Sequence, residues 1–244
     1  MSDDQPTSRR SFISSAAASA GSVVLATTAA GAADTPKDAG MPVAPAFQSS
    51  ETLNPLPFDP AKVPGLSERM LKSHWENNYG GSVKALAAVK KRLADMQGDK
   101  DLPPYVYNDL KREHFLRTGS VVFHEYYFES LGGSGQAGAA ERQRIASAFG
   151  SFDAWESEFR SIGAGLGGGS GWVVLGFNQH TRQLENYWMA DHAHGPATTT
   201  PILVMDMYEH SYQMDYGAAA GKYIEAFFKN IQWEVVAARL AGAK

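Results

Sequence analysis

The sequence predicts an α+β protein in which helices come first and strands come later. Residues 66–131 carry apolar side chains at helical spacing, whereas residues 170–191 and 201–205 contain short runs rich in β-branched and aromatic residues. A last amphipathic stretch, residues 222–240, predicts a closing helix. With 244 residues and 43% hydrophobic content, the chain is long enough for one large domain or for two small ones that share a core.

Residues 1–33 are predicted to be an export signal peptide. Arg9 and Arg10, within the segment SRRSFIS, precede a weakly apolar stretch that ends in small residues with A-x-A spacing. This arrangement resembles a twin-arginine signal, so we expect a periplasmic or extracellular protein. The apolar stretch is too short and too rich in Ala, Ser and Thr to span a bilayer, so no membrane anchor is expected. Residues 34–52, rich in Pro, Ala and small polar residues, are predicted to be a linker.

Two helices are expected in the region that follows. The first covers about residues 66–96, with Ser67 as its N-cap. Gly80 and Gly81 interrupt its pattern and predict a kink or local unwinding there. The second covers about residues 105–131 and is ended by the glycine-rich segment GGSGQAG.

The C-terminal half reads as short helices followed by strands. Residues 139–165 predict a helical stretch that is broken at Gly150. Residues 170–191 predict a β-hairpin around the polar turn NQHTRQ, because two aromatic and β-branched runs flank that turn. The run PILVM, residues 201–205, predicts a short buried strand.

Charge and cysteine content exclude several classes of function. The formal net charge is −4, which favours neither a nucleic-acid partner nor an anionic membrane surface. Cysteine is absent, so disulfides, thiolate metal sites and cysteine nucleophiles are excluded. Any metal ion must therefore be held by His, Asp and Glu.

Three of the seven histidines share a context with one acid. His74 lies in the first predicted helix, His124 lies in the second, and His210 follows the predicted buried strand. Asp206 and His210 are separated by four positions, so in a helical turn their side chains project to the same side. Each histidine alone is more often a surface or satisfied residue than a ligand. Together, three imidazoles and one carboxylate form a donor set that suits Fe, Mn or Zn better than Ca or Mg.

Six segments around these residues follow one another in a characteristic order. They are LSERMLKSHWENNYGGSVKAL, SVVFHEYYFESL, IASAFGSFDAWESEF, GSGWVVL, TPILVMDMYEHSYQMDYG and KYIEAFFKNIQWEVVAARL. In order and approximate spacing they resemble the iron/manganese superoxide dismutases, over about residues 53–244. The resemblance implies an N-terminal helical hairpin, residues 53–135, packed on a C-terminal α/β domain, residues 136–244, with a three-stranded antiparallel sheet.

The resemblance also implies a reaction and a ligand set. The reaction is the conversion of superoxide to oxygen and hydrogen peroxide at one Fe or Mn ion per subunit. The implied protein ligands are His74, His124, Asp206 and His210, with a water or hydroxide as the fifth ligand. Glu209 matches a family residue that hydrogen-bonds the ligand histidine of a second subunit, which implies a homodimer. An acid favoured by a helix N-terminus is the other interpretation of Glu209.

Several positions around the implied ligands depart from the family pattern. Counting from His74, Ser82 stands where the family has a Tyr that guards the substrate channel, and Asn78 stands where it commonly has His. Gln213 replaces a Tyr that follows the last ligand, and Tyr208 replaces a Trp that precedes it. Asn78 and Gln213 are therefore predicted to take part in the site in altered form.

The family also has a side chain, usually Gln, that hydrogen-bonds the solvent ligand. Ser120, at one of the two usual positions, is too short for this role. The segment MADHAHG matches the other position, so His192 is the predicted replacement and His194 the alternative. One ring nitrogen of His192 would donate to the solvent, so its other nitrogen should have a partner. Tyr79 carries another hydroxyl near this position. It lies three residues before Ser82, however, so its side chain is expected on a different face of the helix.

Two alternatives stay open at the level of the sequence. Fe and Mn are not distinguished, because the indicator Gln is absent from both usual positions. The altered residues Ser82, Asn78 and Gln213 also allow a non-enzymatic or weakly active metal-binding member of the same fold in the cell envelope. The preserved ligand set favours the enzyme.

Overall fold

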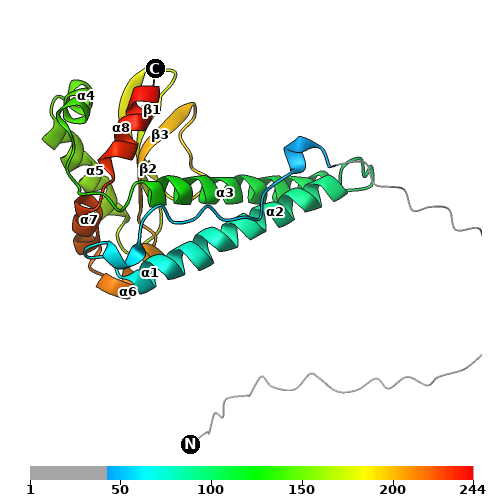
Figure 1. Ribbon diagram of the computed structural model, residues 1–244. Coiled ribbons are helices and arrows are strands. Elements are labelled where there is room, and N and C mark those ends of the chain that lie inside the picture. Colours follow the sequence, from blue (N-terminus) through cyan, green and yellow to red (C-terminus); the bar gives the residue numbers. More distant parts are fainter. Residues whose placement is uncertain (1–42, 244) are drawn as a thin grey trace, which may run out of the picture. The chain divides into compact units, whose positions relative to one another are not determined.

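The structure, a computed structural model, describes residues 43–243 of the chain (Figure 1). The predicted signal peptide and residues 34–42 of the predicted linker lie outside the described residues. A helical part comes first and an α/β part follows, which confirms the predicted α+β class. No helix in the described range is both long enough and apolar enough to cross a bilayer.

Two long helices lie side by side in the helical part (Figure 1). The first is continuous but not uniform, because a π-helical segment interrupts its α-helical hydrogen bonding. The second is close to the predicted helix over residues 105–131. The first long helix consists of α1 (Glu68–Ser73), η3 (His74–Tyr79) and α2 (Gly80–Asp95). The second is α3 (Pro104–Glu129). Two short helical turns precede both, η1 (Pro45–Phe47) and η2 (Pro60–Lys62).

The start of the first long helix agrees with the prediction, whereas its irregular turn is displaced. Ser67 caps α1, because its hydroxyl accepts a hydrogen bond from the backbone amide of Met70 at 3.1 Å. Gly80 and Gly81 begin the regular helix α2, and the irregular turn is η3, directly before them. Glycine flexibility therefore does not set this irregularity. It coincides with side chains of η3 that bond to other parts of the chain.

Three antiparallel strands form the sheet, in the order β2-β1-β3. The hairpin of β1 (Trp172–Asn178) and β2 (Gln183–Met189) confirms the predicted hairpin, and β3 (Thr199–Asp206) contains the predicted strand PILVM. Trp172 at the start of β1 pairs with Asp206 at the end of β3. This register brings Trp172 beside the acid that follows the buried run.

Helices of both parts pack against the sheet. Helix α4 (Ala139–Phe149) and helix α5 (Phe152–Leu166) are separated at Gly150, as predicted, where a φ of 85° favours glycine. Ser151 then caps α5 by accepting a hydrogen bond from the backbone amide of Ala154 at 3.0 Å. Helix α5 contacts β1 and β2, while α3 contacts β3. The end of β3 therefore lies next to the helical part.

The single closing helix predicted over residues 222–240 is wrong. The structure has two helices there, α7 (Ala220–Lys229) and α8 (Trp233–Gly242). Between them, the backbone amide of Gln232 donates to the carbonyl of Ser130 at the end of α3, at 2.8 Å. A tertiary hydrogen bond thus replaces a helical one, and apolar periodicity does not reveal such a change.

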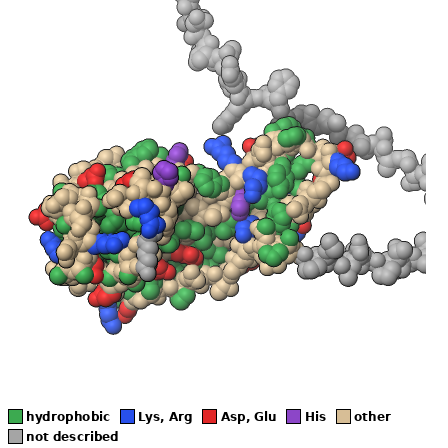
Figure 2. Space-filling model, turned by 90° about the horizontal axis from the view of Figure 1, so that it is seen from above, with side chains coloured by type: hydrophobic (Ala, Val, Ile, Leu, Met, Phe, Trp, Pro, Cys, Tyr) green, Lys and Arg blue, Asp and Glu red, His purple; other side chains and the backbone are tan. Residues whose placement is uncertain are grey.

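One core serves both parts of the molecule. Its largest fully buried side chains are Trp155, Trp172, Tyr79, Tyr127, Tyr212 and Tyr223, which come from helices and strands of both parts. On the face shown in Figure 2, Lys and Arg side chains are interspersed with Asp and Glu. That face therefore presents no extended field of a single sign.

Candidate metal centre

Four polar side chains meet where the two long helices reach the end of β3. His74 begins η3, His124 lies on α3, Asp206 ends β3, and His210 lies in the next turn, η4 (Glu209–Ser211). Their candidate ligand atoms all lie within 4.8 Å of one another. His74, His124 and Asp206 are at most 1% exposed, which is rare for polar side chains unless they are bonded or bind a ligand.

One oxygen of Asp206 lies at the centre of the group. Asp206 Oδ2 is 3.2 Å from Nε2 of His74, 3.2 Å from Nε2 of His210 and 3.7 Å from Nε2 of His124. The other oxygen, Oδ1, accepts a hydrogen bond from the backbone amide of Tyr208 at 2.8 Å. That bond orients the carboxylate so that Oδ2 faces the three imidazoles.

Several buried ring nitrogens in this group lack a hydrogen-bond partner. His124 Nδ1 donates to the carbonyl of Ser120 at 2.7 Å, so the neutral ring carries its lone pair on Nε2, which has no hydrogen bond. His74 makes no hydrogen bond through either ring nitrogen. A buried polar atom without a partner costs about 1–3 kcal/mol, whereas a cation would take the lone pair directly. These nitrogens therefore fit a metal ion among the four side chains.

The protonation states also suit a cation. Burial lowers the pKa of His74 and lowers the pKa of His124 to about 3. Burial by itself would raise the pKa of Asp206, but the nearby imidazoles of His210 and His74 outweigh it and hold that pKa well below its ordinary value. An ionised carboxylate beside neutral imidazoles is the state in which these side chains can donate electron pairs to a metal.

A pocket of about 460 Å³ adjoins the group at His124 and His210. The hydroxyls of Ser82 and Ser120 face each other across its wall at 2.8 Å, and both residues are buried. Arg117 also lines the pocket and forms an ion pair with Glu113 at 2.6 Å. Short polar side chains therefore form much of the wall near the candidate ligands.

His192 lines the same pocket and is held on several sides. Trp172 Nε1 donates to His192 Nδ1 at 3.0 Å, which supplies the partner expected for one of its nitrogens. Because Nδ1 accepts this bond, the neutral ring carries its proton on Nε2. The ring of Tyr208 stacks on it with centroids 4.7 Å apart, and burial lowers the pKa of His192. Nε2 of His192 is thus a hydrogen-bond donor. The His192 ring lies close to a candidate ligand, with its centroid 5.9 Å from that of His124.

The loop that carries His192 approaches α3 at Gly119. A Cβ atom at this position would lie 1.9 Å from the carbonyl oxygen of His192, which is too close for any L side chain. We expect Gly119→Ala to lower the free energy of unfolding by about 1–3 kcal/mol, because the loop must move to admit the methyl group. Urea denaturation measures this change.

A matched substitution separates this collision from helix propensity. Gly165 also lies in a helix, α5, but nothing lies within 4 Å of a Cβ built there. Gly165→Ala should therefore stabilise the protein by about 0.5–1 kcal/mol. Equal effects at Gly119 and Gly165 would show that the approach of the loop to α3 is not tight.

The other residues singled out in the sequence occupy different places. Asn78 and Tyr208 line the pocket, whereas Gln213 is exposed at the start of α6 (Gln213–Tyr216) and is not among the residues that line it. The roles predicted for Asn78 and Gln213 stay predictions. The imidazole of His194 is 57% exposed and pairs with Asp191 at 2.8 Å, so His192 is the better placed of the two loop histidines.

The place of Arg117 in the pocket wall and the pairing of Ser120 with Ser82 were not predicted from the sequence. A signal was present, because Arg117, Ser120 and His124 recur at positions i, i+3 and i+7 of one helix and therefore share a face. The pairing across the two long helices had no such signal. It depends on how the helices pack.

The fold and the donor set define a class of protein. A helical hairpin on a small antiparallel sheet presents three histidines and one aspartate at a single buried point. This class is an α+β protein with a mononuclear transition-metal site, and the donor set suits Fe, Mn or Zn.

Comparison with known proteins narrows this class to one family. Residues 137–239 match the family model described as iron/manganese superoxide dismutases, C-terminal domain. The chain is 48% identical over 191 residues to a superoxide dismutase [Fe] of Cupriavidus metallidurans, a match that covers 78% of this chain and 96% of that protein. It is 31% identical to superoxide dismutase [Mn] 2 of Haloferax volcanii, covering 78% of this chain and 95% of that protein. For a superoxide dismutase [Fe] of Aquifex aeolicus the identity is 32%, over 75% of this chain and 88% of that protein.

The chain therefore belongs to the iron/manganese superoxide dismutase family. Both the sequence identity and the length of the match support this membership, because the match covers nearly the whole of the Cupriavidus protein.

Proposed function

We propose that this protein is a superoxide dismutase that converts superoxide to oxygen and hydrogen peroxide at one Fe or Mn ion per chain. The ligands in this proposal are His74, His124, Asp206 and His210. The observation that carries it is the convergence of their donor atoms within 4.8 Å, at a point where buried ring nitrogens have no hydrogen bond. The family membership supplies the reaction.

The protein side of the reaction follows from the residues around the site. A bound Fe or Mn ion would supply the one-electron chemistry by which superoxide is oxidised in one encounter and reduced in the next. Asp206 contributes the only carboxylate among the four ligand side chains and offsets part of the positive charge of the ion. His74 and His124 contribute neutral nitrogens from a buried environment, which limits access of bulk water.

Substrate and protons reach the site through the pocket. Superoxide is an anion, so the guanidinium of Arg117 favours its entry, although Glu113 offsets part of that charge. Peroxide formation consumes protons, and His192 presents Nε2–H at the inner wall of the pocket. Ser82 and Ser120 add a buried pair of hydroxyls, bonded to each other, to the wall of the pocket.

The proposal is tested on the full chain purified from its native host. Metal analysis should find about one Fe or Mn per chain, and the preparation should remove superoxide. A preparation that is fully loaded with Fe or Mn but inactive would contradict the proposed activity. It would favour the alternative of a metal-binding member of the fold without catalytic turnover.

His192→Ala should lower the rate of superoxide removal by about 10- to 100-fold while metal content stays unchanged, because outer hydrogen-bonding partners contribute to activity at this scale. Stopped-flow kinetics alongside metal analysis measures both quantities. His194→Ala is the matched control, since His194 lies in the same loop but is largely exposed. Equal losses in the two variants would argue against a role for His192 in proton supply.

We further propose that the protein forms a homodimer through Glu209 and His210. Glu209 is exposed, and the His210 side chain is 25% exposed although its ring belongs to the candidate centre. A second subunit would cover this edge and let Glu209 bond the partner's His210. Light scattering should find a dimer that Glu209→Ala weakens, and a monomeric parent protein would contradict the proposal.

We also propose that the protein is exported by a twin-arginine signal that includes Arg9 and Arg10. The pathway, as a class, carries folded proteins, which suits a metal bound by parts of the chain that meet only after folding. Replacing both arginines by Lys should leave the protein in the cytoplasm, measured by cell fractionation. Unchanged export of that variant would refute the proposal.

A further inference from the structure

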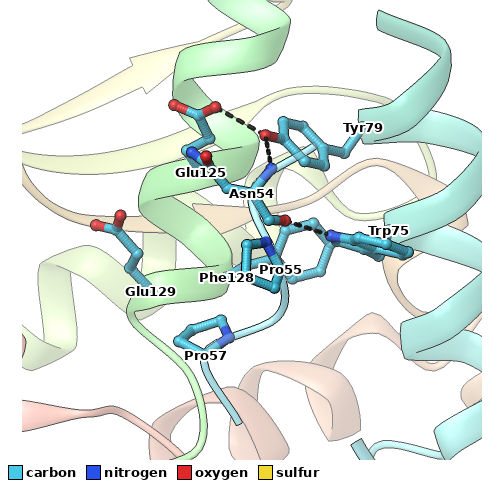
Figure 3. A pocket seen from close by; sticks show the side chains of 8 residues that line it. All are labelled: Asn54, Pro55, Pro57, Trp75, Tyr79, Glu125, Phe128 and Glu129. Atoms are coloured by element: carbon cyan, nitrogen blue, oxygen red, sulfur yellow. Dashed lines mark hydrogen bonds between the residues drawn. The ribbon is translucent and has the colours of Figure 1, made fainter. Parts of the chain in front are cut away.

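The N-terminal strap, residues 52–57, is bonded to the first long helix through Asn54, and Tyr79 links that contact to the second long helix (Figure 3). The backbone amide of Asn54 donates to Tyr79 Oη at 3.1 Å, and its carbonyl accepts from Trp75 Nε1 at 2.9 Å. Tyr79 Oη donates in turn to Glu125 Oε1 on α3 at 2.8 Å. A chain of hydrogen bonds therefore joins the strap, the first long helix and the second.

Both residues that bond the strap belong to the π-helical segment η3. A π-helical turn is rare and its hydrogen bonds are less regular than those of an α-helix, so it persists where other contacts support it. His74 begins η3 and Tyr79 ends it. If the segment relaxed to an α-helix, the two sides of the turn would rotate relative to each other by about 100°, the angle of one residue. That rotation would carry His74 away from Asp206.

Tyr79 also connects the two helices that carry histidine ligands. Its acceptor, Glu125, directly follows His124 in α3. The Tyr79 ring is buried, and its centroid lies 6.3 Å from that of His124. Phe128 packs between the two residues, with its ring centroid 6.2 Å from that of Tyr79 and 5.0 Å from that of His74. The Tyr79 hydroxyl bonds the strap and Glu125, so it does not take the place of the tyrosine hydroxyl that the family has at the position of Ser82.

We propose that Tyr79 and Trp75 are positioning residues of the metal centre. Through Asn54 and Glu125 they hold the π-helical turn and the spacing of the two long helices, and thereby the approach of His74 to His124. This inference rests on the proposed metal centre. Neither residue is among the ligands, so each acts through the position of His74.

The test uses the full chain loaded with its metal. Tyr79→Phe removes the hydroxyl and keeps the ring, so it breaks both hydrogen bonds of that hydroxyl with little change in packing. We expect EDTA to remove the metal about tenfold faster from this variant than from the parent. This value is the lower end of the roughly 10- to 100-fold loss of metal affinity that follows when a hydrogen-bonding partner of a ligand is removed. In protein loaded with iron, the ferric electron paramagnetic resonance signal should also change, because a displaced His74 alters the ligand field. Trp75→Phe removes the other bond to Asn54 and should show a smaller change of the same kind.

A second tyrosine supplies the matched control. Tyr187 Oη donates to Glu185 Oε2 at 2.5 Å on the sheet, away from the candidate ligands. Tyr187→Phe therefore removes a comparable bond and should leave the rate of metal loss unchanged. Equal rates of metal loss for Tyr79→Phe and Tyr187→Phe would overturn the proposal.

Variants at Glu125 separate the hydrogen bond from the charge. Glu125→Gln keeps an oxygen that accepts from Tyr79, so it should retain metal almost as the parent does, whereas Glu125→Ala removes one of the two bonds of the Tyr79 hydroxyl and should show part of the change seen in Tyr79→Phe. Adding Glu125→Ala to Tyr79→Phe should change the rate of metal loss little further, because the bond to Glu125 is already lost in Tyr79→Phe. Full additivity would also overturn the proposal.

These measurements are independent of the proposed activity. A parent protein that binds Fe or Mn but does not remove superoxide contradicts the proposed function and leaves the comparison of metal loss unaffected. An active parent whose Tyr79→Phe variant keeps its metal as firmly as the parent contradicts only the positioning role.

Discussion

Asp206→Ala is expected to abolish metal binding and superoxide removal together. The residue is fully buried, and its Oδ2 lies within 3.7 Å of all three candidate histidine ligands. Without it, the site offers only neutral imidazoles to a cation. Loss of an outer partner of a ligand lowers metal affinity by about 10- to 100-fold, so loss of this charged ligand should cost at least about 100-fold. Metal analysis after dialysis and a superoxide assay measure both effects.

Asp215→Ala is the control for the loss of a bonded carboxylate elsewhere. Asp215 accepts hydrogen bonds from the backbone amide and the hydroxyl of Ser67 at 2.7 and 2.6 Å, at the start of the first long helix. Its removal should cost some stability and leave metal content unchanged. Full metal content in folded Asp206→Ala, checked by circular dichroism, would mean that the metal is bound elsewhere.

Removal of the metal should lower the thermal midpoint of the protein by about 10 °C. A ligand that binds only the folded chain stabilises it by about 4 kcal/mol at a concentration 1,000 times its dissociation constant, and each kcal/mol moves the midpoint by about 2–4 °C in a chain of this size. The loss of stability on metal removal arises at the candidate ligands themselves. Without a cation, nitrogens of His74 and His124 stay buried without hydrogen-bond partners. Differential scanning fluorimetry before and after chelation measures the shift.

Restoring the metal should reverse the loss of thermal stability. Addition of Fe or Mn to the stripped protein should raise the midpoint again, and the metal that restores both midpoint and activity identifies the working ion. Asp206→Ala should not respond to either addition. A stripped protein as stable as the loaded one would show that the four side chains do not hold the metal.

Much of the fold follows from local features of the sequence. Ser67 and Gly150 mark a helix start and a helix break, and the structure has both where the sequence predicts them. The hairpin around NQHTRQ is equally local, because aromatic and β-branched runs on either side of a short polar turn favour two antiparallel strands. Caps, turns and periodicity act over a few residues, so they can be predicted without knowledge of the rest of the chain.

The candidate centre could be predicted only in part. The spacing of Asp206 and His210 indicates a shared side of a turn, and His74 and His124 were added as histidines of two predicted helices. Only the resemblance to a family implied that all four bind one metal ion. The partner of His192 could not be foreseen, because Trp172 is brought to it by the register of β1 with β3 and by the loop after β2.

The fold class, the order of helices and strands, and the residues that can donate to a metal can be predicted from the sequence alone. The π-helical turn at His74, the break before Trp233 and the bonds of Tyr79 to Asn54 and Glu125 arise only in the packed chain. Their cause is the same in each case. These features depend on hydrogen bonds between segments far apart in the chain, and such bonds override the local preference for a regular helix once the segments are packed together.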